Sequence, residues 1–296
     1  MIGGLALAAT AVSITFWVDV SVDLVFFDAR ALHGEPWRFA LCVLPHGDLF
    51  HLIFNLGWLW TFGTYVEEKA GSLATALLCL FLGVTSMGIQ YAFSGPGIGL
   101  SGIGYGLFGL LWVLSKRSPR HADAMDPSTV RLFLIWFAIC IITTMTGLWL
   151  VGNAAHAGGL AAGVAVGLVF TERGPRRAGA IVGCVAVLAL AVLGAGPLRP
   201  FVSLGGKGVG QDSAYLAWRA QEDGDDRTAV TLYREAIALD DKQPGWWLNL
   251  AIAELSLGEL DEAEEATARL EALEPTSERA LGLRRQLERL RGVTAD

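Results

Sequence analysis

Long apolar runs that lack charged residues recur from Ile2 to about Pro197 and then stop. About 20 consecutive apolar residues suffice to cross the hydrocarbon core of a bilayer. The whole sequence is 53% hydrophobic and only 17% charged, which is more apolar surface than a soluble globular protein needs. Beyond Lys207 the chain becomes charged, acidic and rich in helix-forming residues. These features predict a multi-span membrane domain followed by a smaller soluble domain.

The apolar runs predict seven membrane spans. The first is expected to be a retained span rather than a signal peptide, because no Lys or Arg precedes it and no clear small-residue cleavage site follows it. Several runs are short, which neighbouring helices or a locally thinner bilayer can accommodate. The expected spans cover residues 2–18, 50–66, 72–93, 101–115, 131–150, 154–171 and 178–196.

The soluble tail contains an internal repeat. Gly and Pro residues after the seventh span predict a linker over residues 198–211. Gly224-Asp225 is followed 34 residues later by Gly258-Glu259, which is the period of tetratricopeptide repeats. Two unrelated amphipathic hairpins are the alternative. Only two repeats are visible, and a last helix near Ser277–Arg291 is expected to cap them.

Composition argues against two classes of site. The formal net charge is −7 and no basic stripe is present, so nucleic acid is not an expected partner. The four cysteines show no CxxC spacing, and three of them fall inside apolar runs. They are therefore interpreted as small hydrophobic residues rather than metal ligands or disulfide partners. These residues are Cys42, Cys79, Cys140 and Cys184.

Ser101 lies at the start of the fourth span, directly after the Gly/Pro-rich segment SGPGIGL of residues 94–100. Non-helical backbone at membrane depth is tolerated only where protein or a water-filled cavity surrounds it. The surrounding Gly-Leu-Ser-Gly string is weak by itself, because small residues also pack membrane helices together. Free backbone N–H groups and the positive end of the helix dipole would nevertheless lie beside this serine. These are the elements of an oxyanion hole.

His156 interrupts the otherwise apolar sixth span. It could be a packing residue or a hydrogen-bonding link between helices, but burying an ionisable group without a partner is costly, and Ser101 is a suitable partner. Glycines at roughly one-turn spacing on both spans predict the close approach that a Ser–His hydrogen bond requires. Because the nearest acidic residues in sequence are Asp126 and Glu172, a dyad is expected rather than a triad. The glycines are Gly102, Gly106, Gly109, Gly159, Gly163 and Gly167.

Four further residues are candidates for the same site. Tyr105, one helical turn after Ser101, could hold the His156 ring or make an interhelical hydrogen bond. His51 and Asn55 are four residues apart on the second span, and either stabilise an oxyanion or form a helix-stabilising network. His46 precedes them in a loop, where a histidine often only braces the fold.

Together these residues resemble the rhomboid family of intramembrane serine proteases over about residues 1–171. The matching segments are Glu35-Pro36-Trp37-Arg38 in the first loop, the HGDLFHLIFN run from His46 to Asn55, Gly99-Leu100-Ser101-Gly102 with Tyr105, and Asn153-Ala154-Ala155-His156 followed by Gly159 and Gly163.

The resemblance implies an all-α fold: a polytopic membrane helical bundle with a six-helix rhomboid core over residues 1–171, then a small C-terminal helical-repeat domain. A connection and a seventh span are expected over residues 172–197, and the repeats over 212–296. The implied nucleophile is Ser101 and the implied base is His156, with an oxyanion hole formed by the Ser101 backbone N–H, His51 and Asn55. The implied supporting residues are Tyr105, Gly99, Gly102, His46, Trp37 and Arg38.

The implied function is hydrolysis of peptide bonds in single-span transmembrane substrates near the outer membrane face, without a metal or an organic cofactor. The lipid bilayer and a protein bound by the repeat domain are the other expected partners. A catalytically silent membrane adaptor is the alternative. Inactive relatives usually lose the serine or the histidine, whereas both are present here.

The basic residues predict the orientation of the chain in a bacterial cell membrane. The 116–131 and 172–178 connections carry most of the Lys and Arg between spans and are therefore expected in the cytoplasm. The N-terminus would then be cytoplasmic, Ser101 would lie toward the outer face, and the repeat domain would be extracytoplasmic.

Overall fold

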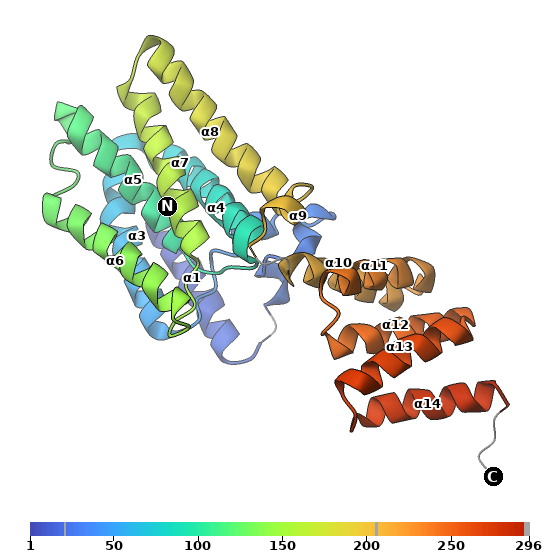
Figure 1. Cartoon of the computed structure of the whole chain (residues 1–296). Helices are drawn as coiled ribbons and strands as arrows, with labels where there is room; N and C mark the ends of the chain where they lie inside the picture. Colours follow the sequence, from blue (N-terminus) through green and yellow to red (C-terminus); the bar gives the residue numbers. More distant parts are fainter. Residues whose placement is uncertain (21, 205–206, 293–296) are drawn as a thin grey trace. The chain divides into compact units, whose positions relative to one another are not determined.

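The chain forms two compact units, Met1–Leu204 and Gly205–Asp296, in a computed structural model that describes residues 1–20, 22–204 and 207–292. The described residues are helical or irregular and contain no β-strand (Figure 1). The expected all-α class is confirmed.

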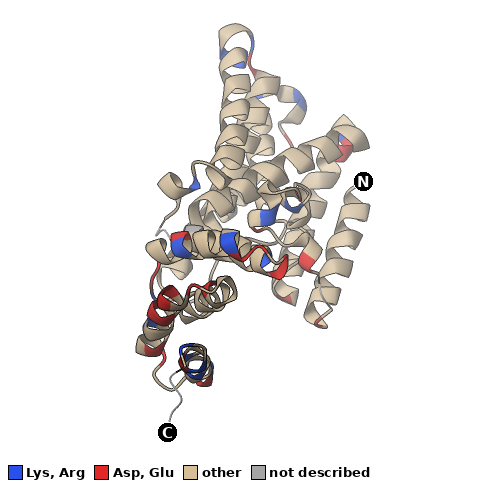
Figure 2. Ribbon diagram, turned by 90° about the vertical axis from the view of Figure 1, so that its right-hand side faces the viewer, with Lys and Arg blue, Asp and Glu red and all other residues tan. Residues whose placement is uncertain are grey.

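The first unit is a bundle of long helices (Figure 1). The central helix, α5, packs against α3, α4 and α7, and α8 packs against α4 and α7. Figure 2 shows that the charged residues of this bundle gather at helix ends and in loops. The long helices are α1 (Ile2–Trp17), α3 (Leu49–Ala70), α4 (Ser72–Ser94), α5 (Ser101–Arg117), α6 (Pro127–Met145), α7 (Asn153–Thr171) and α8 (Gly174–Ala195).

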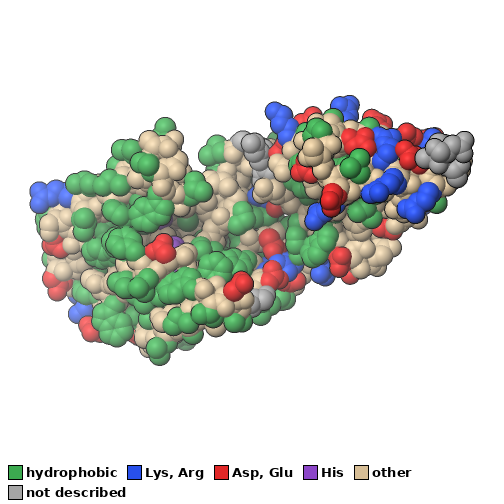
Figure 3. All heavy atoms as spheres, turned by 90° about the horizontal axis from the view of Figure 1, so that it is seen from below, with side chains coloured by type: hydrophobic (Ala, Val, Ile, Leu, Met, Phe, Trp, Pro, Cys, Tyr) green, Lys and Arg blue, Asp and Glu red, His purple; other side chains and the backbone are tan. Residues whose placement is uncertain are grey.

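The seven predicted spans correspond to these seven helices. Of the helices in the described part of the chain, α4, α6, α7 and α8 are long and apolar enough to cross a membrane. α1 is apolar but has 16 residues. α5 needs little lipid-facing surface, because residues 102–111 are all buried. Hydrophobic side chains cover much of the face of the bundle that Figure 3 shows, as expected for a surface that faces lipid.

Glycines set the distance between α5 and α7. A methyl group added to Gly159 would overlap the backbone carbonyl of Gly102, and one added to Gly163 would overlap that of Gly106. Backbone therefore contacts backbone directly, as small residues permit in membrane helix pairs. The fourth and sixth predicted spans, α5 and α7, therefore approach each other as closely as predicted.

The long first loop is fastened by one arginine. It contains the short helices η1 (Asp23–Val25), η2 (Ala29–Leu32) and α2 (Arg38–Leu41). The buried Arg38 guanidinium donates to the carbonyls of Asp23 and Phe26 at 2.5 and 2.7 Å, and to the Glu35 carboxylate at 2.6 Å. Burial of this charge is tolerable because its donors are paired.

Two predicted boundaries differ from the structure. α6 ends at Met145 rather than near residue 150, because the chain turns at Gly147, whose φ is +72°. The linker expected over residues 198–211 contains a short helix, α9 (Arg199–Val202), and α10 already begins at Lys207. Residues 205–206 of that linker lie outside the described residues.

The second unit consists of helical hairpins. Gly224 and Gly258, with φ of +80° and +77°, form the turns after α10 and α12, which explains their 34-residue spacing. The core is built from small and aromatic side chains such as Ala217, Tyr233 and Ala251. The helices are α10 (Lys207–Glu222), α11 (Asp226–Leu239), α12 (Pro244–Leu257), α13 (Leu260–Leu273) and α14 (Glu278–Leu290).

Candidate active site

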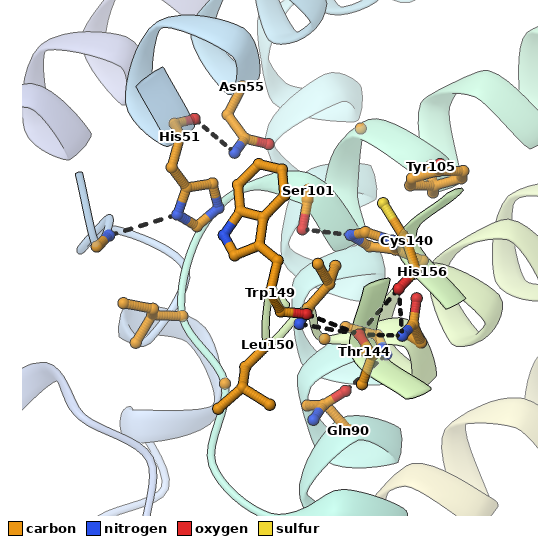
Figure 4. A pocket seen from close by; sticks show the side chains of 18 of the residues that line it. His51, Asn55, Gln90, Ser101, Tyr105, Cys140, Thr144, Trp149, Leu150 and His156 are labelled. Atoms are coloured by element: carbon orange, nitrogen blue, oxygen red, sulfur yellow. Dashed lines mark hydrogen bonds between the residues drawn. The ribbon is translucent and has the colours of Figure 1, made fainter. Parts of the chain in front are cut away.

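Ser101 is the first residue of α5 and lies beside His156 on the first turn of α7. The Ser101 Oγ and the His156 Nε2 are 2.9 Å apart, within the range of a hydrogen bond (Figure 4). The glycine contact between α5 and α7 brings the two side chains this close. Gly102, the residue after Ser101, has no room for a side chain because a methyl group would overlap Ser86 of α4.

The His156 ring is held by aromatic packing. Tyr105 stacks on it with a centroid distance of 4.4 Å and an interplanar angle of 24°, and Phe137 lies beside it at 6.2 Å. The second ring nitrogen, Nδ1, is buried and has no hydrogen-bond partner among the described residues. A third polar group that would complete a triad is therefore not seen in the part of the chain that the structure describes.

The loop before Ser101 is braced by His46. The Leu100 N–H donates to His46 Nε2 at 3.3 Å, so Nδ1 carries the ring proton and donates to the Leu44 carbonyl at 2.9 Å. Burial lowers the pKa of His46 to about 4, so the ring is neutral and Nε2 remains an acceptor near neutral pH. His46 thus contacts the backbone next to the serine rather than the serine itself.

His51 and Asn55 project from α3 toward the same cavity (Figure 4). His51 Nδ1 accepts from the Gly47 N–H at 3.4 Å, and the Asn55 amide donates to the His51 carbonyl at 2.8 Å. Both contacts are local, to backbone groups of α3 and of the loop before it. Since an asparagine amide has two N–H groups, one remains for another acceptor. Gly99 packs against the His51 ring, where its φ of +99° also favours glycine.

The cavity around these residues has a volume of about 700 Å³. Aromatic and aliphatic side chains supply much of its wall, and a few polar groups point into it, a combination typical of ligand sites. Residues from α3, α4, α5, α6 and α7 contribute to it. Its aromatic residues include Phe50, Phe54, Trp136 and Trp149.

The structure adds polar residues that sequence reasoning did not single out. Gln90 of α4 lines the cavity, and its side-chain oxygen accepts from the Ala155 N–H at 3.1 Å, next to His156. Thr144 also lines the cavity and accepts from the Asn153 amide at 2.9 Å. A glutamine inside an apolar span is itself an unusual feature, and that signal could have identified Gln90.

Two predicted supporting residues lie elsewhere. Trp37 and Arg38 do not line the cavity. Arg38 instead fastens the first loop, as described above, and Trp37 is exposed beside it. Both residues lie in the first loop, where the resemblance places their motif.

Comparison with known proteins finds a match for each of the two parts of the chain. A rhomboid domain matches residues 33–173, and a tetratricopeptide repeat matches residues 220–287. A rhomboid protease GlpG of Klebsiella pneumoniae subsp. pneumoniae is 34% identical over 149 residues, which are 50% of this chain and 53% of that protein. A rhomboid protease GlpG of Enterobacter sp. is 32% identical over 159 residues, 53% of this chain and 57% of that protein. The chain thus spans about half the length of the curated relatives it matches.

The stacking of Tyr105 on His156 can be tested apart from its hydroxyl group, which donates to the Phe133 carbonyl at 3.4 Å. Tyr105→Ala removes the ring and should slow fluorophosphonate modification of Ser101 on the order of 10²-fold, the scale expected when a reacting group is misplaced. Tyr105→Phe keeps the ring and should stay close to the wild-type rate. Rates are measured by mass spectrometry of the intact protein. Equal losses in both variants would assign the effect to the hydroxyl group.

Proposed function

We propose that the chain is an intramembrane serine protease of the rhomboid family in which Ser101 and His156 form the catalytic dyad. The 2.9 Å contact between Ser101 Oγ and His156 Nε2 carries this proposal. The two residues line a cavity inside a bundle whose outer surface is apolar. The substrates proposed are single-span transmembrane proteins, because the cavity lies within a bundle that exposes many large apolar side chains, as a surface facing lipid does.

In the proposed reaction, Ser101 attacks the carbonyl carbon of the scissile bond while His156 Nε2 takes the Oγ proton. The proton is then given to the leaving amine, and water releases the acyl group from Ser101. The oxyanion accepts hydrogen bonds from the Ser101 backbone N–H, which is free at the start of α5, and from Asn55 and His51. A helical substrate must unwind first, so Gly or Pro near the scissile bond favours cleavage.

Labelling with a fluorophosphonate tests the dyad without knowledge of the substrate. The wild-type protein should be modified at Ser101, as located by peptide mass spectrometry. Ser101→Ala should not be labelled, and His156→Ala should lose labelling because the hydroxyl group is no longer activated. Ser115→Ala, which removes a hydroxyl at the far end of the same helix, is the matched control and should label normally. A folded wild-type protein that does not react would favour the silent adaptor.

The oxyanion role of Asn55 predicts a loss of rate. Asn55→Ala should reduce kcat for a single-span model substrate by about 10²-fold or more, the usual scale for one lost oxyanion donor. Because the amide also caps the His51 carbonyl, thermal unfolding in detergent is measured in parallel. An increase in KM alone, with kcat unchanged, would assign Asn55 to substrate binding instead.

We place the protein in a bacterial cell membrane with the N-terminus in the cytoplasm and the repeat unit outside it. Basic residues end α5 and connect α7 to α8, where Arg117 pairs with Glu172. The Met1 ammonium group binds Glu67 near the end of α3 at 2.6 Å. Ser101 begins α5 at the opposite end of that helix, which would be the outer side. The repeat unit would bind a protein partner or substrate there.

A cysteine scan tests this orientation. Ser277→Cys, before α14, should react with a membrane-impermeant maleimide in intact cells. Ser118→Cys, in the connection between α5 and α6, should react only after lysis and is the matched control. The unsubstituted protein gives the background from its four native cysteines. Labelling of Ser277→Cys only after lysis would place the repeat unit in the cytoplasm.

A further inference from the structure

We propose that Leu204, in the segment after α8, forms one wall of a substrate subsite and selects the size of an apolar substrate side chain. This inference rests on the proposed protease function. Leu204 lines the cavity that contains Ser101 and His156, together with Ser94 at the end of α4 and with Pro96 and Gly97 in the loop before α5. It lies outside residues 33–173, which the rhomboid domain matches.

The backbone of this segment is fixed to the end of α4. The Leu204 N–H donates to the Phe93 carbonyl at 2.7 Å, and Arg199 Nε donates to the Tyr91 carbonyl at 3.1 Å. The Arg199 guanidinium also lies over the Tyr91 ring, 3.7 Å from its centroid, and the residue is only 2% exposed. A buried, stacked arginine is a rigid anchor, so the position of Leu204 is set by the bundle.

Close packing of α8 against α4 fixes the position of the segment that contains Arg199. α8 contacts α4 through small residues: a methyl group on Gly88 would be 2.8 Å from the Ala191 carbonyl, and one on Gly194 would be 3.1 Å from Ala92. Small residues at both contacts let the two helices approach closely. The segment that follows α8 therefore lies at the C-terminal end of α4, where the loop to Ser101 begins.

The side chain of Leu204 has little protein around it. It is 75% exposed although its backbone is tied down. Together with Pro96 it offers apolar surface beside the polar groups of the cavity. An extended substrate that places its scissile carbonyl at Ser101 would present neighbouring side chains to this wall. An apolar side chain seated there would cover Leu204 and gain from burial.

The test compares cleavage of a panel of substrates by matched variants. A single-span model substrate is varied at five positions on each side of the cleaved bond, with Ala, Leu or Phe placed at one position at a time. kcat/KM is measured in detergent for wild type, Leu204→Ala, Leu204→Trp and Leu198→Ala. Leu198 is the control because it belongs to the same segment and is 42% exposed, but does not line the cavity.

A subsite predicts a change confined to one substrate position. There, Leu204→Ala should raise the Phe-to-Ala preference about 10-fold or more, and Leu204→Trp should lower it, as expected when a hydrophobic pocket gains or loses space. Leu198→Ala should leave the profile unchanged. An unchanged profile in both Leu204 variants, or a uniform loss at every position, would overturn the inference while leaving the protease function intact. A wild type that cleaves no substrate and leaves Ser101 unlabelled would refute the proposed function, and this inference with it.

Discussion

The direct backbone contact between α5 and α7 is the constraint on which the rest of the site depends. Side chains at Gly159 or Gly163 would collide with carbonyl groups, which cannot move aside as a flexible side chain can. The helices that carry Ser101 and His156 are thereby held at a fixed separation. A hydrogen bond of 2.9 Å between Ser101 and His156 follows from that separation, without a loop having to close over the site.

Support for the serine comes from several directions. His46 accepts from the Leu100 N–H, and Gly99 allows the loop to turn against the His51 ring. Gln90 accepts from the Ala155 N–H, next to His156 in sequence. These polar contacts lie within an apolar bundle, where each unpaired polar group would cost free energy. The side chains that accept hydrogen bonds from the backbone therefore also determine the shape of the cavity.

The sequence was most informative where a physical requirement is local. Uncharged runs located the seven helices, the 34-residue period located the hairpins, and glycine spacing predicted the approach of α5 to α7. The sequence was least informative about residues whose contacts lie far away along the chain. Nothing near Leu204 in sequence relates it to Ser94, and Arg38 resembled a site residue although it fastens a loop. The end of α6 was missed because the apolar run continues past the turn at Gly147.

Among the described residues, the His156 imidazole stacks on the Tyr105 ring, and no carboxylate binds its second nitrogen. Stacking is short-ranged and involves no net charge, so dissolved ions cannot screen it as they screen an ion pair. Compression and bilayer composition act on packing instead, because they change how closely the helices that carry the two rings are held. The orientation of the proposed base is therefore expected to respond to changes in the surrounding lipid more than to the ionic strength of the solution outside.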